Sequence, residues 1–241
     1  MGRLILTALL TALAAPAVAA PPPIIARALA DPARPAKDVT ADAIRLPAET
    51  IAFAGVKPGM TVGEFYPGGG YFTRLLSDVV GPTGHVYAME NDKWKEAPVV
   101  QALEAYGRRN VTVDSGPFGT VRFPRPLDIA WITQNYHDLK IAKYGVVDTA
   151  AFNRAVFAAL KPGGTYFVLD HEAPPGTSIE DIARLHRIEK AQVIREVTAA
   201  GFRLAGEGTF LHRSGDDHTK SIFDKAIQGK TDQYALRFIK P

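Results

Sequence analysis

The sequence has no cysteine among its 241 residues. This absence excludes disulfides, thiolate metal sites and cysteine nucleophiles. The hydrophobic core alone must therefore hold the folded chain, and 46% hydrophobic residues are enough for one good core. We expect a single main domain.

An excess of charge of one sign is also missing. Lys and Arg number 28 against 25 Asp and Glu, which gives a formal net charge of +3, and no long basic run is present. Proteins that bind nucleic acid usually carry a concentrated basic surface. The sequence therefore predicts no nucleic-acid partner and favours a small molecule as ligand, while it gives no indication of the oligomeric state.

One long apolar run is present, and it lies in the first twenty residues, MGRLILTALLTALAAPAVAA. Arg3 precedes the run, and Ala17-Val18-Ala19 has the small-x-small pattern of a secretory cleavage site. The run is shorter than the about 20 apolar residues that a membrane-spanning helix needs. We expect 1–20 to be a cleaved signal peptide of an exported, periplasmic protein without a stable membrane anchor. The alternative is an uncleaved anchor.

Residues 21–44 are rich in Pro and Ala, and we expect an irregular N-terminal arm there. From residue 45 to 241, strand-like and helix-like segments alternate, which is the pattern of an α/β fold with a parallel sheet. The last two strands have no helix between them, so the final strand is expected to enter antiparallel. The expected strands are 61–66, 85–92, 111–113, 127–133, 165–170, 208–213 and 232–240, and the expected helices lie within 45–60, 71–80, 94–107, 148–160, 178–189 and 190–202.

Three glycines separate a strand from a helix in the stretch GEFYPGGGYFTRLL. Gly68, Gly69 and Gly70 permit positive φ and close backbone approach, and a helix N-terminus offers free N–H groups. Glu64 ends this strand and Glu90 ends the next one, where a carboxylate can accept hydrogen bonds from a ribose diol. A tight turn with two solvated strand ends is the simpler reading, but the combination favours a ligand site.

Two more polar stretches, NYHD and LDHE, follow neighbouring expected strands. We expect their side chains His137, Asp138, Asp170 and His171 to meet around one cleft. One hypothesis is general acid–base catalysis, with His137 as the first choice of base and Asp170 and His171 assisting. A second is a divalent metal held by these imidazoles and carboxylates. A third is that they only cap loops.

Some other residues have simpler interpretations. We expect His186, in RLHRIE, to brace a loop, although its helix is placed to roof the cleft. The run GDDHT (215–219) fits a polar hairpin loop better than a metal site. Tyr136 and Phe118 are expected in loops, where they could touch a ligand.

Together these motifs resemble the class I S-adenosylmethionine-dependent methyltransferases. That family has an acidic strand end followed by a Gly-rich loop, a second acidic strand end, and a parallel sheet closed by an antiparallel hairpin strand. The resemblance covers roughly residues 45–240 and is strongest to the exported, predicted methyltransferases of bacteria, through PGGG, NYHD, DH, LHRI and GKTDQ. It implies a Rossmann-like class I sheet with helices on both faces, and methyl transfer from S-adenosylmethionine to an unidentified small molecule.

The resemblance also implies roles for the residues of the first two motifs. Glu64 and the glycine turn, Gly68 to Gly70, would face the methionine and ribose part of the cofactor. Glu90 would accept hydrogen bonds from the ribose hydroxyls.

By the same resemblance, other positions would complete the cofactor site. Asp114 and Ser115 would lie near the adenine edge, and Asn135 and Tyr136 would lie toward the substrate. Tyr66 stands where the family has the first glycine of its loop. It would therefore stack on the cofactor or narrow the pocket.

Two features of the sequence leave alternatives open. Metal-dependent O-methyltransferases have a carboxylate after the fourth strand and an Asp-Asn pair after the fifth, which here is Asp170-His171, so a divalent metal is a second candidate cofactor. S-adenosylmethionine is made in the cytosol, whereas the signal peptide predicts export. The alternative function is thus an exported, non-catalytic module that keeps the fold and binds a metal or small ligand.

Overall fold

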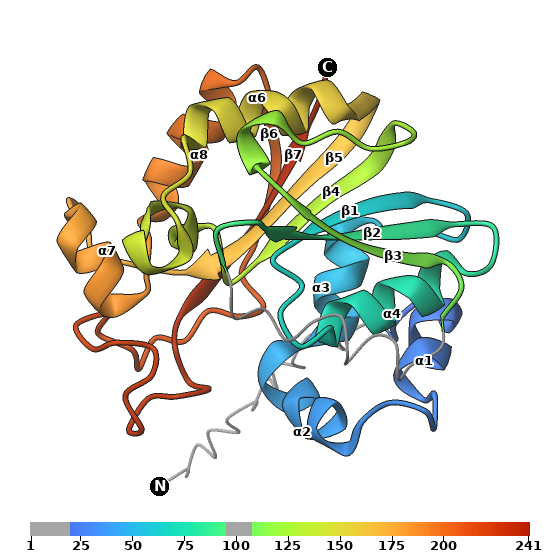
Figure 1. Cartoon of the computed structure of the whole chain (residues 1–241). Helices are drawn as coiled ribbons and strands as arrows, with labels where there is room; N and C mark the ends of the chain where they lie inside the picture. The colour runs from blue at the N-terminus through green and yellow to red at the C-terminus, as the bar shows by residue number, and fades with distance from the viewer. Residues whose placement is uncertain (1–19, 95–107) are drawn as a thin grey trace, which may run out of the picture.

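The centre of the molecule is a twisted seven-stranded sheet, shown in Figure 1. The computed structural model describes residues 20–94 and 108–241. The strands are β1 (Thr61–Phe65), β2 (His85–Asn91), β3 (Val111–Gly116), β4 (Leu127–Thr133), β5 (Leu160–His171), β6 (Arg203–Gly208) and β7 (Gln233–Ile239).

The strands are arranged in the order β3-β2-β1-β4-β5-β7-β6. Strands β1 to β5 are parallel, whereas β7 runs antiparallel to both of its neighbours. The expected α/β sheet with an antiparallel terminal strand is confirmed. The chain order reverses between β1 and β4, which pair directly, and ligands of such sheets bind beside that reversal at the carboxyl ends of the strands.

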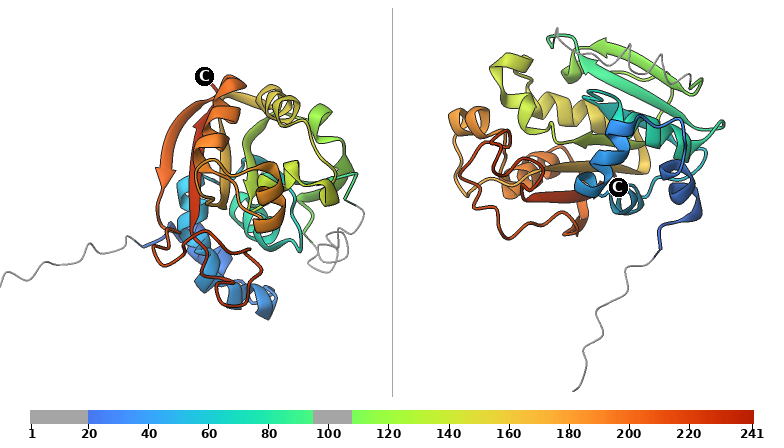
Figure 2. Two further views of the ribbon diagram at one scale, coloured as in Figure 1. Left: turned by 90° about the vertical axis from the view of Figure 1, so that its left-hand side faces the viewer. Right: turned by 90° about the horizontal axis from the view of Figure 1, so that it is seen from below.

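Helices cover both faces of the sheet. Figures 1 and 2 show α1, α3 and α4 on one face and α6 and α8 on the other. The helices are α1 (Pro23–Leu29), α2 (Ala36–Arg45), α3 (Pro47–Ala54), α4 (Tyr71–Val80), α6 (Thr149–Ala159), α7 (Ile179–Leu185) and α8 (Lys190–Ala199), with 3-10 turns η1 (Phe118–Thr120), η2 (His137–Lys140) and η3 (Ala142–Tyr144).

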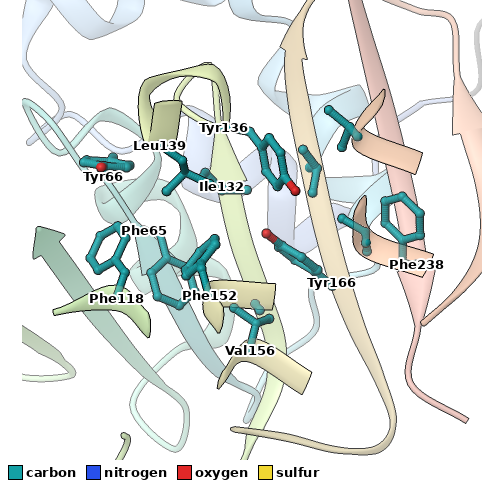
Figure 3. Packing of buried hydrophobic residues seen from close by; sticks show 14 of the residues in the cluster. Phe65, Tyr66, Phe118, Ile132, Tyr136, Leu139, Phe152, Val156, Tyr166 and Phe238 are labelled. Atoms are coloured by element: carbon teal, nitrogen blue, oxygen red, sulfur yellow. The ribbon is translucent and has the colours of Figure 1, made fainter. Parts of the chain in front are cut away.

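Two apolar cores result, one on each face of the sheet. Side chains alternate along a strand, so Trp131 of β4 packs into the α4-side core and Ile132 into the α6-side core. Figure 3 shows the α6-side core, where the rings of Phe65 and Phe152 meet edge to face with centroids 4.9 Å apart. Because both faces are covered, the central strands are mostly apolar, as β4 is between Asp128 and Thr133.

The N-terminal arm differs from the expectation of irregular structure, because residues 21–44 contain α1 and most of α2. Ile25 of α1 is buried in the α4-side core. Asp38 of α2 forms a buried ion pair with Arg74 of α4, with an Nε–Oδ2 distance of 2.8 Å. These contacts attach the arm firmly to the domain.

Two other expectations need correction, and two lie outside the described residues. The strand expected at 208–213 is not found: β6 lies before it and ends at Gly208, and residues 209–213 are irregular with a turn at 210–211. The helix expected at 178–189 ends at Leu185, because His186 adopts a left-handed conformation with φ 54°. The expected helix 94–107 and signal peptide 1–20 lie outside the described residues, apart from Trp94 and Ala20.

Among the described residues, no helix is long and apolar enough to cross a bilayer.

Candidate active site

Two buried carboxyl groups lie side by side at the end of the sheet. Glu64 of β1 and Glu90 of β2 are only 2% and 4% exposed, and their strands pair in parallel. Burial, together with the neighbouring Glu90 carboxylate, raises the pKa of Glu64 to about 8. Burial raises the pKa of Glu90 to about 7. Both groups are therefore poised between charged and neutral forms near neutral pH.

Three of the four oxygens of these carboxyl groups have no hydrogen-bond partner among the described residues. Among the described residues, nothing donates a hydrogen bond to either oxygen of Glu90 or to Oε2 of Glu64. The Gly68 amide lies near enough to favour the ionised form of Glu90 without reaching hydrogen-bond geometry. Leaving buried acceptors unsatisfied costs about 1–3 kcal/mol each. Such a cost is typical of a site whose missing donors belong to a ligand.

The glycine turn next to these carboxyl groups leaves room for a ligand. Gly68 and Gly70 have φ of 53° and 76°, conformations that favour glycine, and Gly70 is the N-cap of α4. A Cβ atom added to Gly68 or Gly69 would meet no described atom within 4 Å. The turn is therefore open above its backbone, as close approach by a ligand requires.

Tyr66 does not stand over this turn. Its ring packs in the α6-side core, 4.9 Å from Phe118 between centroids, and its hydroxyl accepts a hydrogen bond from Asn91 at 3.2 Å. Its φ is 54°, a left-handed backbone conformation that is uncommon for residues other than glycine. The side chain thus leaves open the space beside Gly68 and Gly69 rather than filling it.

The residues assigned to the adenine edge lie at the rim of this site. Asp114 and Ser115 are exposed on β3, and the register places Ser115 beside Glu90. The Asp114 carboxylate accepts a hydrogen bond from the Ser115 amide at 2.8 Å. Neither side chain is fixed by the core, so both are available to a bound molecule.

The second cluster is organised around Asp170, which is fully buried at the end of β5. Its Oδ1 accepts hydrogen bonds from His137 Nδ1 and the His171 amide, both at 2.7 Å, and its Oδ2 accepts one from the His137 amide at 2.9 Å. Burial alone would lower the pKa of His137, but the Asp170 and Asp138 carboxylates outweigh it and raise that pKa to about 10. His137 is then protonated at neutral pH, which does not suit the role of base.

Asp138 lies on the other side of the His137 ring. Its Oδ1 is 3.2 Å from His137 Nε2 and 3.4 Å from His186 Nδ1, while its Oδ2 accepts a hydrogen bond from Asn135 at 2.7 Å. The expected meeting of His137, Asp138 and Asp170 is found. His186, which we expected only to brace a loop, joins them.

The His171 side chain points elsewhere. Its Nδ1 lies 3.0 Å from the hydroxyl of Thr231, and it lines a cavity of about 240 Å³ between α2 and the carboxyl ends of β4 and β5. Burial, together with the positive charge of His137 and Arg187, lowers the pKa of His171. The cavity is lined by Ala41, Ile44, Arg45, Gln134, His171, Ile222, Phe223, Gln228, Gly229, Thr231 and Gln233.

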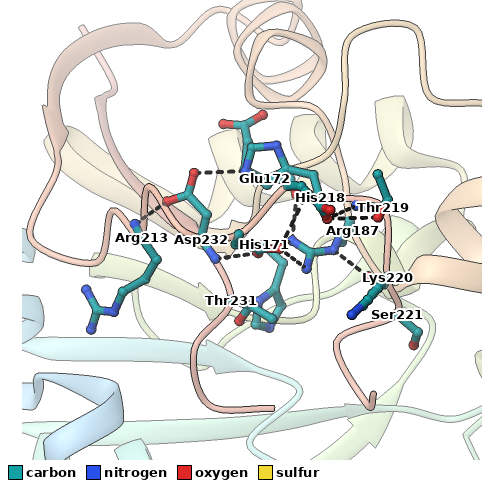
Figure 4. Close-up of polar contacts among 12 residues, drawn as sticks. His171, Glu172, Arg187, Arg213, His218, Thr219, Lys220, Ser221, Thr231 and Asp232 are labelled. Carbon is teal, nitrogen blue, oxygen red and sulfur yellow. Dashed lines mark hydrogen bonds and ion pairs between the residues drawn. The ribbon is translucent and has the colours of Figure 1, made fainter. Parts of the chain in front are cut away.

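One wall of this cavity is the loop before β7, which a buried ion pair holds in place. Figure 4 shows Arg187 at its centre, with the guanidinium 2.8 Å from the carboxylate of Asp216. Asp216 also accepts a hydrogen bond from the Asp232 amide at 2.7 Å. The run 215–219 thus braces the loop, as its reading as a polar hairpin loop suggested, and Asp216 is its buried anchor.

Two aromatic residues expected to touch a ligand are core residues instead. Phe118 is 1% exposed and stacks on Phe152, with centroids 5.4 Å apart. Tyr136 is fully buried, and its hydroxyl bonds to Asn153 and Glu196. Both follow strands, but apolar packing draws their rings inward.

Some cavity residues were not singled out from the sequence. Thr231 lies within GKTDQ, which was quoted only for its family resemblance, and Gln134 precedes NYHD. Arg45 lies in α2, its guanidinium 4.7 Å from the ring centroid of Tyr71, the residue after Gly70. Arg45 thereby connects the cavity with the glycine turn. Such a contact cannot be recognised from a local sequence pattern.

Comparison with known proteins agrees with this geometry, although no model of a protein family matches the chain. The chain is 26% identical over 194 residues to the ubiquinone/menaquinone biosynthesis C-methyltransferase UbiE of Vibrio cholerae, covering 78% of this chain and 71% of that protein.

Solved structures share the fold. A SAM-dependent methyltransferase from Aquifex aeolicus superimposes with a TM-score of 0.59 at 21% identity, covering 86% of this chain and 99% of that one. CrArsM, an arsenic(III) S-adenosylmethionine methyltransferase from Chlamydomonas reinhardtii, gives 0.55 at 17% identity, with coverages of 92% and 74%. The chain thus has the fold of the class I S-adenosylmethionine-dependent methyltransferases and is homologous to enzymes of that class.

Proposed function

We propose that the protein binds S-adenosylmethionine between the glycine turn and the two buried glutamates, and that it methylates a small molecule. The observation that carries the proposal is the pair of Glu90 oxygens, buried and without a donor among the described residues. A fold alone does not define a reaction, so the proposal rests on this site together with the homologous methyltransferases.

The residues present fit this cofactor. The Glu90 carboxylate offers acceptors for two ribose hydroxyls, and the open backbone at Gly68 and Gly69 accommodates a molecule in close contact. The buried Glu64 carboxyl would ionise next to the cationic methionine part, because a nearby positive charge lowers its pKa. When bound, the cofactor supplies an electrophilic methyl group on its sulfonium. The chain's contribution is to position that group in line with a nucleophile.

We place the methyl acceptor in the cavity beside His171. The cavity of about 240 Å³ suits a small molecule, and Arg45 connects it with the glycine turn. Nδ1 of His171 is hydrogen-bonded to the Thr231 hydroxyl. The other ring nitrogen, Nε2, is therefore the one that would take a proton from the acceptor. In this assignment His171 is the base, and His137 and Asp170 fix the loops around it.

The test is calorimetric titration of the mature chain with S-adenosylmethionine and S-adenosylhomocysteine. We expect saturable binding that Glu90→Gln weakens at least tenfold and the exposed control Glu207→Gln leaves unchanged. Once an acceptor is found by screening, His171→Asn should lower turnover without changing cofactor affinity. Folded protein that binds neither ligand would overturn the proposal, and full turnover by His171→Asn would overturn the base.

The alternative of a non-catalytic module receives no support from the relatives, which are methyltransferases. Export remains part of the proposal, on the strength of the apolar run and the Ala17-Val18-Ala19 pattern. Cell fractionation with N-terminal sequencing should find a periplasmic chain that begins near residue 20. An intact N-terminus in the cytosol would contradict it.

A further inference from the structure

Three side chains from different segments converge beside the cavity. His137 and Asp138 begin η2, and His186 ends α7. One ligand atom from each, two imidazole nitrogens and a carboxylate oxygen, lie within 4.8 Å of one another. Neither the glycine turn nor the His171 cavity uses these atoms.

The distances match the edges of a coordination polyhedron. His137 Nε2 and His186 Nδ1 lie 3.2 Å and 3.4 Å from Asp138 Oδ1. Ligand atoms about 2.0–2.1 Å from a metal are about 2.9 Å apart across an octahedral right angle and about 3.4 Å apart in a tetrahedron. The two distances to Asp138 Oδ1 therefore match those between ligands of one ion, and the two imidazole nitrogens lie within 4.8 Å of each other.

Asp138 carries a separate sign of a missing partner. The residue is 5% exposed, and its Oδ1 accepts no hydrogen bond with acceptable geometry from any described residue. Its Oδ2 is occupied by Asn135, so the free oxygen is the one directed between the two imidazoles. A cation at that point would satisfy it.

The surroundings are those of a metal site. Nδ1 of His137 is bonded to the Asp170 carboxylate at 2.7 Å, which fixes the ring and presents Nε2, as second carboxylates do behind histidine ligands. His186 is held in a left-handed conformation, and its ring packs against Phe223 with centroids 4.8 Å apart. Strained residues of this kind cluster at functional sites.

We propose that His137, Asp138 and His186 bind one divalent first-row transition-metal ion, with Asp170 as the carboxylate that orients His137. Two imidazoles and one carboxylate suit Zn²⁺, Fe²⁺ or Co²⁺, whereas Mg²⁺ prefers an all-oxygen site. The ion would displace the proton that His137 otherwise holds between the two carboxylates. The remaining coordination positions are left for water or for a ligand atom. The site does not depend on methyl transfer.

The experiment is titration of chelator-treated full chain with Zn²⁺, Co²⁺ and Mg²⁺, followed by calorimetry and by the visible d–d absorption of bound Co²⁺. We expect one equivalent of Zn²⁺ or Co²⁺ to bind and Mg²⁺ not to bind. His186→Ala and Asp138→Asn should abolish binding, Asp170→Asn should weaken it about 10- to 100-fold, and His85→Ala should leave it unchanged.

Circular dichroism and thermal melting establish that each variant is folded. If the variants of the buried residues fail to fold, His186→Ala decides the test, because the His186 side chain is 14% exposed. Absence of one-equivalent binding in the wild type, Zn²⁺ affinity that survives His186→Ala, or equal affinity for Mg²⁺ would each overturn the proposal. The group would then be only an imidazolium held between carboxylates.

Discussion

At the scale of single residues, Glu64 binds a proton more tightly in the folded chain than in water. Its pKa is about 8 against an ordinary 4.5, chiefly because the carboxyl is buried. A group whose pKa is higher in the native state gives a stability that falls as pH rises, here between about 4.5 and 8. The proposed site is thus maintained at some cost to the free energy of unfolding.

Replacing Glu64 by Gln should remove part of that pH dependence. Since one pKa unit corresponds to about 1.4 kcal/mol, wild type should lose about 2 kcal/mol or more between pH 5 and pH 9 through this residue. Urea unfolding at both pH values measures the difference. Glu64→Gln should show a shallower decline, whereas Glu207→Gln should follow the wild type. Parallel declines in all three proteins would show that Glu64 is ionised without penalty.

The sequence predicted these carboxyl groups because a strand end can be read from local pattern. Glu64 and Glu90 each close an apolar strand, and parallel strands bring their ends together. The direction of a ring cannot be read in this way. Tyr66 and Tyr136 also follow strands, yet packing in the core turns both rings inward. His186 joins His137 and Asp138 only because the chain bends at the end of α7.

At the scale of elements, the N-terminal helices show why a Pro-rich stretch was misread. Pro23 and Pro47 occupy first-turn positions of α1 and α3, and Pro35 is the N-cap of α2. Proline is well tolerated at these places because its missing N–H is not needed there. Proline, which breaks a helix in its interior, can therefore also begin one. Only the contacts of the segment decide whether a helix forms there.

The ion pair between α2 and α4 should carry much of the arm's attachment. Asp38→Ala removes the carboxylate that accepts two hydrogen bonds from the guanidinium of Arg74, a side chain that is 2% exposed. We expect a loss of about 3 kcal/mol in the free energy of unfolding. Arg74 also donates to the carbonyl of Gly69, so cofactor affinity should fall too.

Denaturant unfolding checks this loss, with Glu207→Ala as an exposed ion-pair control that should change stability little. If Asp38→Ala melts together with the control, α2 is held by its other contacts, among them the hydrogen bond from the Tyr71 hydroxyl to Asp42.

At the scale of the whole molecule, the proposed site exists only when the sheet and the helices on its α4 side are assembled. β1 and β2 supply the glutamates, α4 follows the glycine turn, and α2 lines the neighbouring cavity. A ligand that binds such a site stabilises the entire fold, since the unfolded chain does not contain it.

S-adenosylhomocysteine should therefore raise the melting temperature. At one hundred times its dissociation constant, the gain is about 2.7 kcal/mol. For a chain of this length that corresponds to a rise of about 5–10 °C. Differential scanning fluorimetry measures it, and at the same ligand concentration Glu90→Gln should show about half of this rise or less. An unchanged melting temperature in the wild type would contradict the assignment.

Asp170 has a consequence for how the protein can evolve. One carboxylate group receives three hydrogen bonds and so joins the segment after β4 to the end of β5. A lineage that changes residue 170 alone would release His137 and the His171 amide in the same step. The two segments must therefore be inherited as one unit, and new specificities should arise instead in the walls contributed by α2 and the loop before β7.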